Sequence, residues 1–134
     1  MKEYNGKVRV VFKNMVVHPQ VEIAHLAGCA AGKQGKFQQF KNTWWEKAFK
    51  TRKMDEENIN AIAKEIGLNM DKFKAALDNN VHKAKIDADA EAGNKAGING
   101  TPAFVINGYY ISGAQPESAF KKLINRALKE AEGK

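Results

Sequence analysis

The chain has 134 residues, of which 43% are hydrophobic, and its formal net charge is +7 at pH 7. This length and composition suffice for one hydrophobic core, so we expect a single domain over residues 1–134. No stretch approaches the roughly 18 consecutive apolar residues of a membrane span, and the first twenty residues lack a signal-peptide pattern. The single cysteine excludes a disulfide within the chain.

The positive charge is concentrated in the first 53 residues, which carry a net charge of +8. Between residues 33 and 53, lysines alternate with aromatic side chains, a composition that can bind anions or stack on single-stranded nucleic acid. However, Phe37, Phe40 and Trp44 recur at helical spacing, which predicts one buried stripe with the lysines on other faces. We therefore interpret this stretch as a solvated helix and consider nucleic acid a weaker alternative partner.

The first predicted elements are one strand and two helices. Residues 7–14 alternate charged and apolar side chains, which predicts a strand. Pro19 can begin a helix, and the Ala/Gly-rich run that follows predicts one over residues 21–31. Two glycines then separate it from a helix expected over about 36–50.

The middle of the chain predicts two more helices. Asp55 is a suitable N-cap, and the apolar stripe behind it ends at Gly67, where a C-terminal glycine belongs. A further helix is expected from Asn69 or Asp71, with a bend near residues 79–80. Its predicted apolar face consists of Phe73, Leu77, Val81, Ala84 and Ala88.

The C-terminal part predicts a hairpin and a final helix. An apolar strand over residues 103–107 reaches Asn107-Gly108, a pair that readily supplies the two positive φ angles of a type I′ turn. A second strand follows, up to about residue 112. Pro116 then begins a helix whose apolar face is expected to cover the sheet.

Several segments, in this order, resemble DsbA-like, thioredoxin-fold thiol-disulfide oxidoreductases. The run Gly97-Ile-Asn-Gly-Thr-Pro-Ala-Phe-Val-Ile-Asn-Gly108 resembles their cis-proline loop and terminal hairpin. Residues 2–14 are similar to the strand after their active-site helix, and residues 30–37 to the junction of their helical insertion. The resemblance extends over about residues 2–130. It implies an α/β, thioredoxin-like fold with a helical insertion at about 20–97.

The same resemblance implies that the family's N-terminal strand and its Cys-x-x-Cys segment are missing here. That strand would lie between the strands at 7–14 and 103–107, so its absence leaves backbone unpaired on both sides. We expect a homodimer or a rearranged sheet to compensate.

The resemblance also gives a candidate substrate-binding loop, formed by Gly100, Thr101, Pro102 and Ala103. Proline lacks an amide donor, and a cis Thr101-Pro102 bond would expose neighbouring backbone groups to an extended peptide. From pattern alone, an ordinary turn before a strand fits equally well.

Other chemical groups receive structural interpretations. Cys29 lies towards the end of an Ala-rich helix, where the dipole opposes a thiolate, so we expect a packed residue and no catalytic role. With His25 and His18 it makes too small a set for a metal site. We expect His82 at the surface.

The acidic residues Asp87, Asp89 and Glu91 point in different directions on a lysine-rich helix. We interpret them as solvated charges and not as a catalytic pair.

The leading hypothesis is therefore a DsbA-like oxidoreductase domain that is redox-inert as this chain, because disulfide exchange needs the absent cysteine pair. The alternative is a natural, non-catalytic module that binds extended peptides or proteins at the proline loop. We expect no catalytic residue, no metal and no cofactor, and an extracytoplasmic, periplasmic location follows from the resemblance alone.

Overall fold

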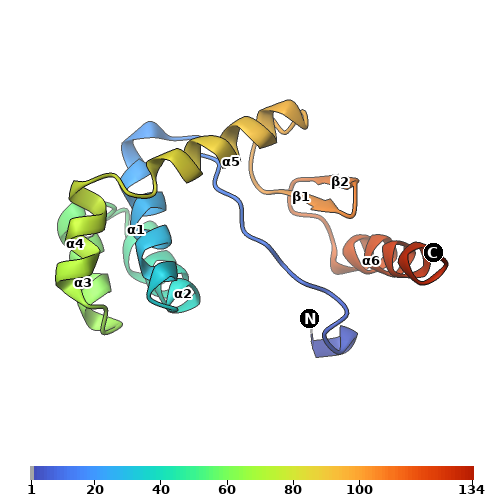
Figure 1. Ribbon diagram of the computed structural model, residues 1–134, viewed down its shortest axis with the longest axis horizontal. Coiled ribbons are helices and arrows are strands. Elements are labelled where there is room, and N and C mark those ends of the chain that lie inside the picture. Colours follow the sequence, from blue (N-terminus) through green and yellow to red (C-terminus); the bar gives the residue numbers. More distant parts are fainter. Residues whose placement is uncertain (1) are drawn as a thin grey trace.

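The computed structural model describes residues 2–134, in which five helices form one body and a hairpin with a sixth helix lies beside it (Figure 1). The helices are α1 (Glu22–Lys33), α2 (Phe37–Trp44), α3 (Glu56–Glu65), α4 (Met70–Asp78), α5 (Lys83–Lys95) and α6 (Glu117–Glu132). Short 3-10 turns lie at Lys2–Tyr4 (η1) and Pro19–Val21 (η2), and a π-helical turn at Trp45–Phe49 (η3) continues α2. The strands are β1 (Ala103–Ile106) and β2 (Tyr109–Ser112).

The core of the helical body lies between α1, α2, α3 and α4. The side chains of Ile59 and Phe73 are fully buried there, and small alanines on α1 let the neighbouring helices approach closely. Phe40 is also buried, while Trp44 packs against this cluster. The predicted aromatic stripe is thus confirmed for Phe40 and Trp44, whereas Phe37 is half-buried and lies outside this cluster.

Helix α3 has the termini that its sequence predicts. The Asp55 carboxylate accepts a hydrogen bond from the backbone N–H of Asn58 at 2.9 Å, which caps the first turn. Gly67 has a φ of 74°, the left-handed conformation that glycine adopts most easily after a helix. The Lys36 ammonium donates to the carbonyls of Ile66 and Gly67 at 2.8 and 3.0 Å, so a side chain from the neighbouring element completes the C-terminus.

The single bent helix expected after Asn69 is wrong. The chain forms two helices, α4 and α5, separated by a turn in which Asn80 has a φ of 49°. This turn changes the helical phase, so Val81, predicted to be buried, is 61% exposed. Ala84 and Ala88 are also exposed, and α5 instead buries Ile86 and Asp89.

The predicted strand at residues 7–14 is also wrong, because no strand lies beside it in the part of the chain that is described. Residues 8–16 run without regular structure, and Val10, Val11 and Phe12 remain more than half exposed. Phe12 still packs on Phe37 of α2, with ring centroids 5.2 Å apart. A pattern of alternating side chains makes a strand only where a neighbour supplies the hydrogen bonds.

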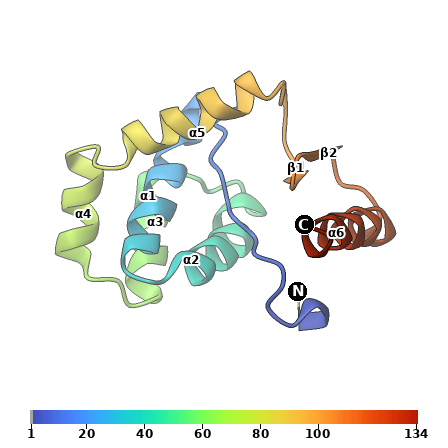
Figure 2. The same ribbon diagram turned by 45° about the vertical axis from the view of Figure 1, so that its right-hand side comes forward.

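We call residues 3–16 the extended segment, and ion pairs hold it towards both ends. Lys7 contacts Glu132 of α6 at 2.8 Å, and Glu3 contacts Lys121 of the same helix at 3.0 Å. At the other end, Lys13 contacts Asp89 of α5 at 2.8 Å. The segment therefore links α6 to the helical body, as both views of the molecule show (Figures 1 and 2).

The hairpin forms as predicted, except that its first strand ends at Ile106. The strands are antiparallel, and the turn residues Asn107 and Gly108 have φ values of 46° and 93°. Phe104 meets Phe120 of α6 edge to face at 4.8 Å, so α6 covers one face of the hairpin. The opposite face stays open, and Val105 and Tyr110 on it are about half exposed.

Among residues 2–134, no helix has both the length and the apolar character needed to cross a bilayer.

Candidate functional site

The loop of Gly100, Thr101, Pro102 and Ala103 enters β1 directly. Its Thr101–Pro102 peptide bond is cis, and both residues are exposed. The Pro102 carbonyl accepts a hydrogen bond from the Gly113 N–H at 2.8 Å, which ties the loop to the end of β2. The loop is therefore held on one side by the hairpin and open on the other.

The open side presents backbone groups suited to an extended peptide. Within residues 2–134, no hydrogen bond reaches the backbone N–H or C=O of Thr101. The adjoining β1 pairs with β2 alone, so one edge of β1 also has no strand beside it there. Unpaired main-chain groups in line with a strand edge can bind a peptide by strand addition.

Cys29 lies away from this loop. It belongs to α1, and both views place α1 and the hairpin on opposite sides of the extended segment (Figures 1 and 2). The thiol is partly buried, and the Asn14 side-chain amide donates to its sulfur at 3.7 Å. These contacts fit the predicted packing role, and nothing brings the thiol to Pro102.

Asn14 connects Cys29 to two further groups. Its Nδ2 also donates to the Asp89 carboxylate at 3.2 Å, which fixes the direction of the amide. Its Oδ1 must then accept from His25 Nδ1, 3.1 Å away, so this histidine carries its proton on Nδ1. Burial lowers the pKa of His25, with partial opposition from the nearby Glu22.

No group of three or more metal-ligating side chains occurs among the residues that the structure describes. His25 and Cys29 share one face of α1, as their spacing predicts, and both face Asn14.

Asp89 is not the solvated charge that the sequence predicts. Its side chain is 4% exposed and binds the Lys13 and Lys85 ammonium groups, each at 2.8 Å. The Asn14 backbone N–H also donates to it, at 3.1 Å. Burial opposes ionisation, but these donors outweigh it and hold the pKa of the carboxyl well below its usual range. We call this group of Asp89, Lys13, Asn14 and Lys85 the Asp89 clasp.

The other two acidic residues of α5 are as predicted. Asp87 pairs with Lys83 and Glu91 with Lys95, and their side chains are more than half exposed.

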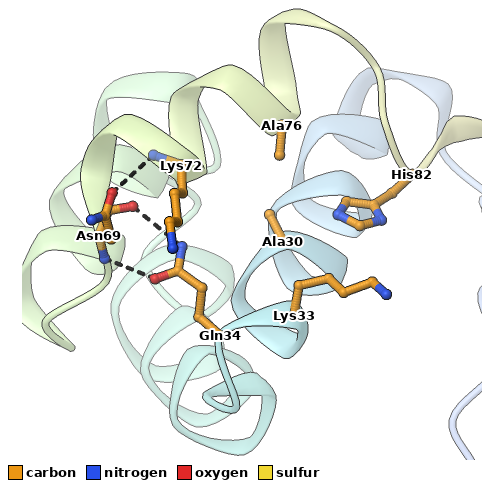
Figure 3. A pocket seen from close by; sticks show the side chains of 7 residues that line it. All are labelled: Ala30, Lys33, Gln34, Asn69, Lys72, Ala76 and His82. Carbon is orange, nitrogen blue, oxygen red and sulfur yellow. Dashed lines mark hydrogen bonds between the residues drawn. The ribbon is translucent and has the colours of Figure 1, made fainter.

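The predicted surface position of His82 is wrong, because its side chain is 6% exposed. Burial, and then the charges of Lys33 and Lys85, lower its pKa. His82 directly precedes α5 and lies where α1, α4 and α5 meet (Figure 3). Its burial follows from the turn between α4 and α5, which local sequence patterns do not place.

Several basic residues of the stretch 33–53 contact other groups of the helical body. Lys47 contacts Glu65 at 2.7 Å, and Lys50 contacts Glu46 at 2.8 Å. Arg52 lies over the Phe49 ring. The stretch is a solvated face above a buried stripe, with Trp45 half exposed and stacked on Phe49.

Comparison with known proteins gives one family and several relatives. Residues 3–125 match the family described as DSBA-like thioredoxin domain. Among solved structures, a thioredoxin-like oxidoreductase from Silicibacter pomeroyi is 26% identical with a TM-score of 0.75, over 87% of this chain and 66% of that chain.

Two curated relatives are much longer than this chain. The Na(+)/H(+) antiporter NhaA of Herminiimonas arsenicoxydans is 27% identical over 112 residues, which are 83% of this chain and 17% of the antiporter. The Na(+)/H(+) antiporter NhaA 1 of Salinispora arenicola is 25% identical over 124 residues, which are 90% of this chain and 19% of that protein. The chain spans less than a fifth of either, so the similarity concerns one segment of those proteins.

Proposed function

Because the chain belongs to the DSBA-like thioredoxin domain family, we propose that it is the peptide-binding scaffold of a thiol-disulfide oxidoreductase. The observation that carries this proposal is the loop at Gly100–Ala103. It is exposed at Thr101 and Pro102, open at the Thr101 backbone and continuous with an edge of β1 that has no strand beside it within residues 2–134. An extended polypeptide substrate forms main-chain hydrogen bonds along this edge.

The residues described contain no pair of thiols for exchange. A thiolate must attack the substrate disulfide and a second thiol must resolve the mixed disulfide, whereas the sequence holds Cys29 alone. Cys29 lies on α1, away from the loop. These 134 residues therefore bind substrate without exchanging disulfides. An extracytoplasmic location suits a protein of this family, since disulfides persist in oxidising compartments.

A peptide-binding measurement tests the role of the loop. The probe is the alkylated B chain of insulin, an extended polypeptide that cannot exchange disulfides. Thr101→Arg places a long side chain on the exposed loop and should weaken binding about tenfold or more, because it blocks main-chain pairing. Ser118→Arg on exposed α6 adds the same charge elsewhere and should leave binding unchanged. Equal affinities of the two variants would contradict the proposal.

A natural, non-catalytic binding module is the second candidate, because the open loop at Thr101 serves binding alone equally well. The two candidates differ in the coding sequence upstream of residue 1. An in-frame Cys-x-x-Cys after a strand pattern supports the oxidoreductase, whereas a start codon without such a segment supports the module.

A second copy of the chain is the partner that we propose for the unpaired backbone. In the described part of the chain, residues 8–16 and the outer edge of β1 have no strand partners, and exposed edges of this kind tend to pair. Sedimentation at increasing concentration should show a dimer. A monomer at every concentration would contradict this part of the proposal.

A further inference from the structure

A pocket of about 350 Å³ lies between α1, α4 and the start of α5, remote from the proline loop. Seven residues line it: Ala30, Lys33, Gln34, Asn69, Lys72, Ala76 and His82 (Figure 3). This set contains two ammonium groups and an imidazole but no carboxylate. Its chemistry therefore favours an anion.

The rim of the pocket is held in place before any ligand binds. The Asn69 N–H donates to the Gln34 side-chain oxygen at 2.8 Å, and the Gln34 amide donates back to the Asn69 carbonyl at 3.2 Å. Asn69 Oδ1 also accepts from the backbone N–H of Lys72 at 2.9 Å, which caps α4. These bonds join the end of α1 to the start of α4 and fix the base of the Lys72 side chain (Figure 3).

His82 contributes an imidazole to the lining of the pocket. The residue is 6% exposed, and its ring lies beside Ala30 and below Ala76 in the view of Figure 3. Among residues 2–134 no hydrogen bond reaches its ring, and the ring nitrogens are not among the fully buried atoms without a partner, so they are open to the pocket. A ligand oxygen in the pocket would provide a partner.

The two lysines are available to the same ligand. Lys33 extends below the His82 ring from α1, and Lys72 enters from α4 on the other side of Ala30 (Figure 3). Among the described residues, neither ammonium group forms an ion pair. Their flexible stems can bring both charges towards an anion over the alanine floor.

We propose that this pocket binds a small phosphate-bearing anion, with Lys33, Lys72 and His82 as its ligands. A phosphate dianion matches the two ammonium charges, and its oxygens accept hydrogen bonds from the lysines and the imidazole. The pocket volume leaves room for an organic group against Ala30 and Ala76, so a phosphate monoester fits as well as inorganic phosphate. This site is independent of the peptide-binding loop.

Binding has a spectroscopic signature at His82. Burial and the charges of Lys33 and Lys85 lower the pKa of His82 and so disfavour its imidazolium form. A bound anion reverses this balance and raises the pKa of His82. His25 does not line the pocket and serves as an internal reference.

The test is an NMR pH titration of the full chain, with and without inorganic phosphate at constant ionic strength. The signal of His82 is assigned with His82→Gln. The pKa of His82 should rise with phosphate while that of His25 stays unchanged. An unchanged His82 titration would overturn the proposal.

Two lysine variants and a second anion make the test specific. Lys72→Ala should weaken phosphate binding about tenfold, the value for loss of one charged hydrogen bond. Lys74→Ala, on the exposed face of the same helix, should have no effect. Equal losses of affinity in the two variants would show general charge attraction and refute the site. Succinate that binds as tightly as phosphate would also refute it. The affinities for glycerol phosphate and inorganic phosphate then show whether the site prefers a phosphate monoester or the free ion. Tighter binding of either supports the proposal.

Discussion

Replacing Asp89 by alanine tests how the extended segment is held on the helical body. Asp89 accepts hydrogen bonds from the backbone and side chain of Asn14, and bonds to a charged group contribute about 1.5 kcal/mol each at the lower end. The ion pairs with Lys13 and Lys85 involve exposed ammonium groups and add about 0.5 kcal/mol or less each. The free energy of unfolding should therefore fall by about 3–4 kcal/mol in Asp89→Ala.

The measurement is urea denaturation, with amide hydrogen exchange at Asn14 as a local probe. Asp87→Ala is the matched control, because Asp87 lies two residues earlier on α5 and its exposed side chain pairs with Lys83 alone. The control should lose about 0.5 kcal/mol or less and leave the Asn14 exchange rate unchanged. The role of the Asp89 clasp would be refuted if both variants lost a similar free energy of unfolding and Asn14 exchanged no faster in Asp89→Ala.

Three further predictions concern stability. Burial lowers the pKa of His25 and His82 below the ordinary 6.5, so the unfolded chain binds protons that the folded chain excludes. The free energy of unfolding should thus decrease as pH falls from 7 to 5, and this decrease should be smaller in His82→Gln. A pH profile of His82→Gln identical to that of the wild type would contradict the prediction. Asp55→Ala removes the α3 cap and should cost about 1 kcal/mol in urea denaturation, whereas no loss would exclude the cap. Phe73→Ala empties a fully buried position and should lower stability by about 3–5 kcal/mol; a loss below about 1 kcal/mol would contradict its place in the core.

Features set by a few neighbouring residues were predictable from the sequence. The Asp55 cap, the glycine after α3 and the Asn107-Gly108 turn each depend on the conformation of one or two residues. The family resemblance added the order of the elements, which local patterns alone do not supply. Together they gave the thioredoxin-like fold class and the helical insertion.

Features that depend on distant contacts were not predictable. Asp89 has the local appearance of a surface acid on a lysine-rich helix, yet its partners Lys13 and Asn14 lie 76 and 75 residues earlier. Likewise, one left-handed residue at Asn80 changes the phase of α5 and buries His82. Residues 7–14 have a strand pattern, but pairing needs a neighbour that the pattern cannot provide.

We propose that this chain binds substrate on a disulfide-exchange fold without carrying out the exchange. A disulfide-reduction assay on insulin, with dithiol oxidation in parallel, tests it most directly when wild type is compared with Cys29→Ala. Both proteins should give equal rates, no higher than the rate without protein. Activity of the wild type well above that of Cys29→Ala would contradict it, because the partly buried thiol on α1 would then be a reacting group.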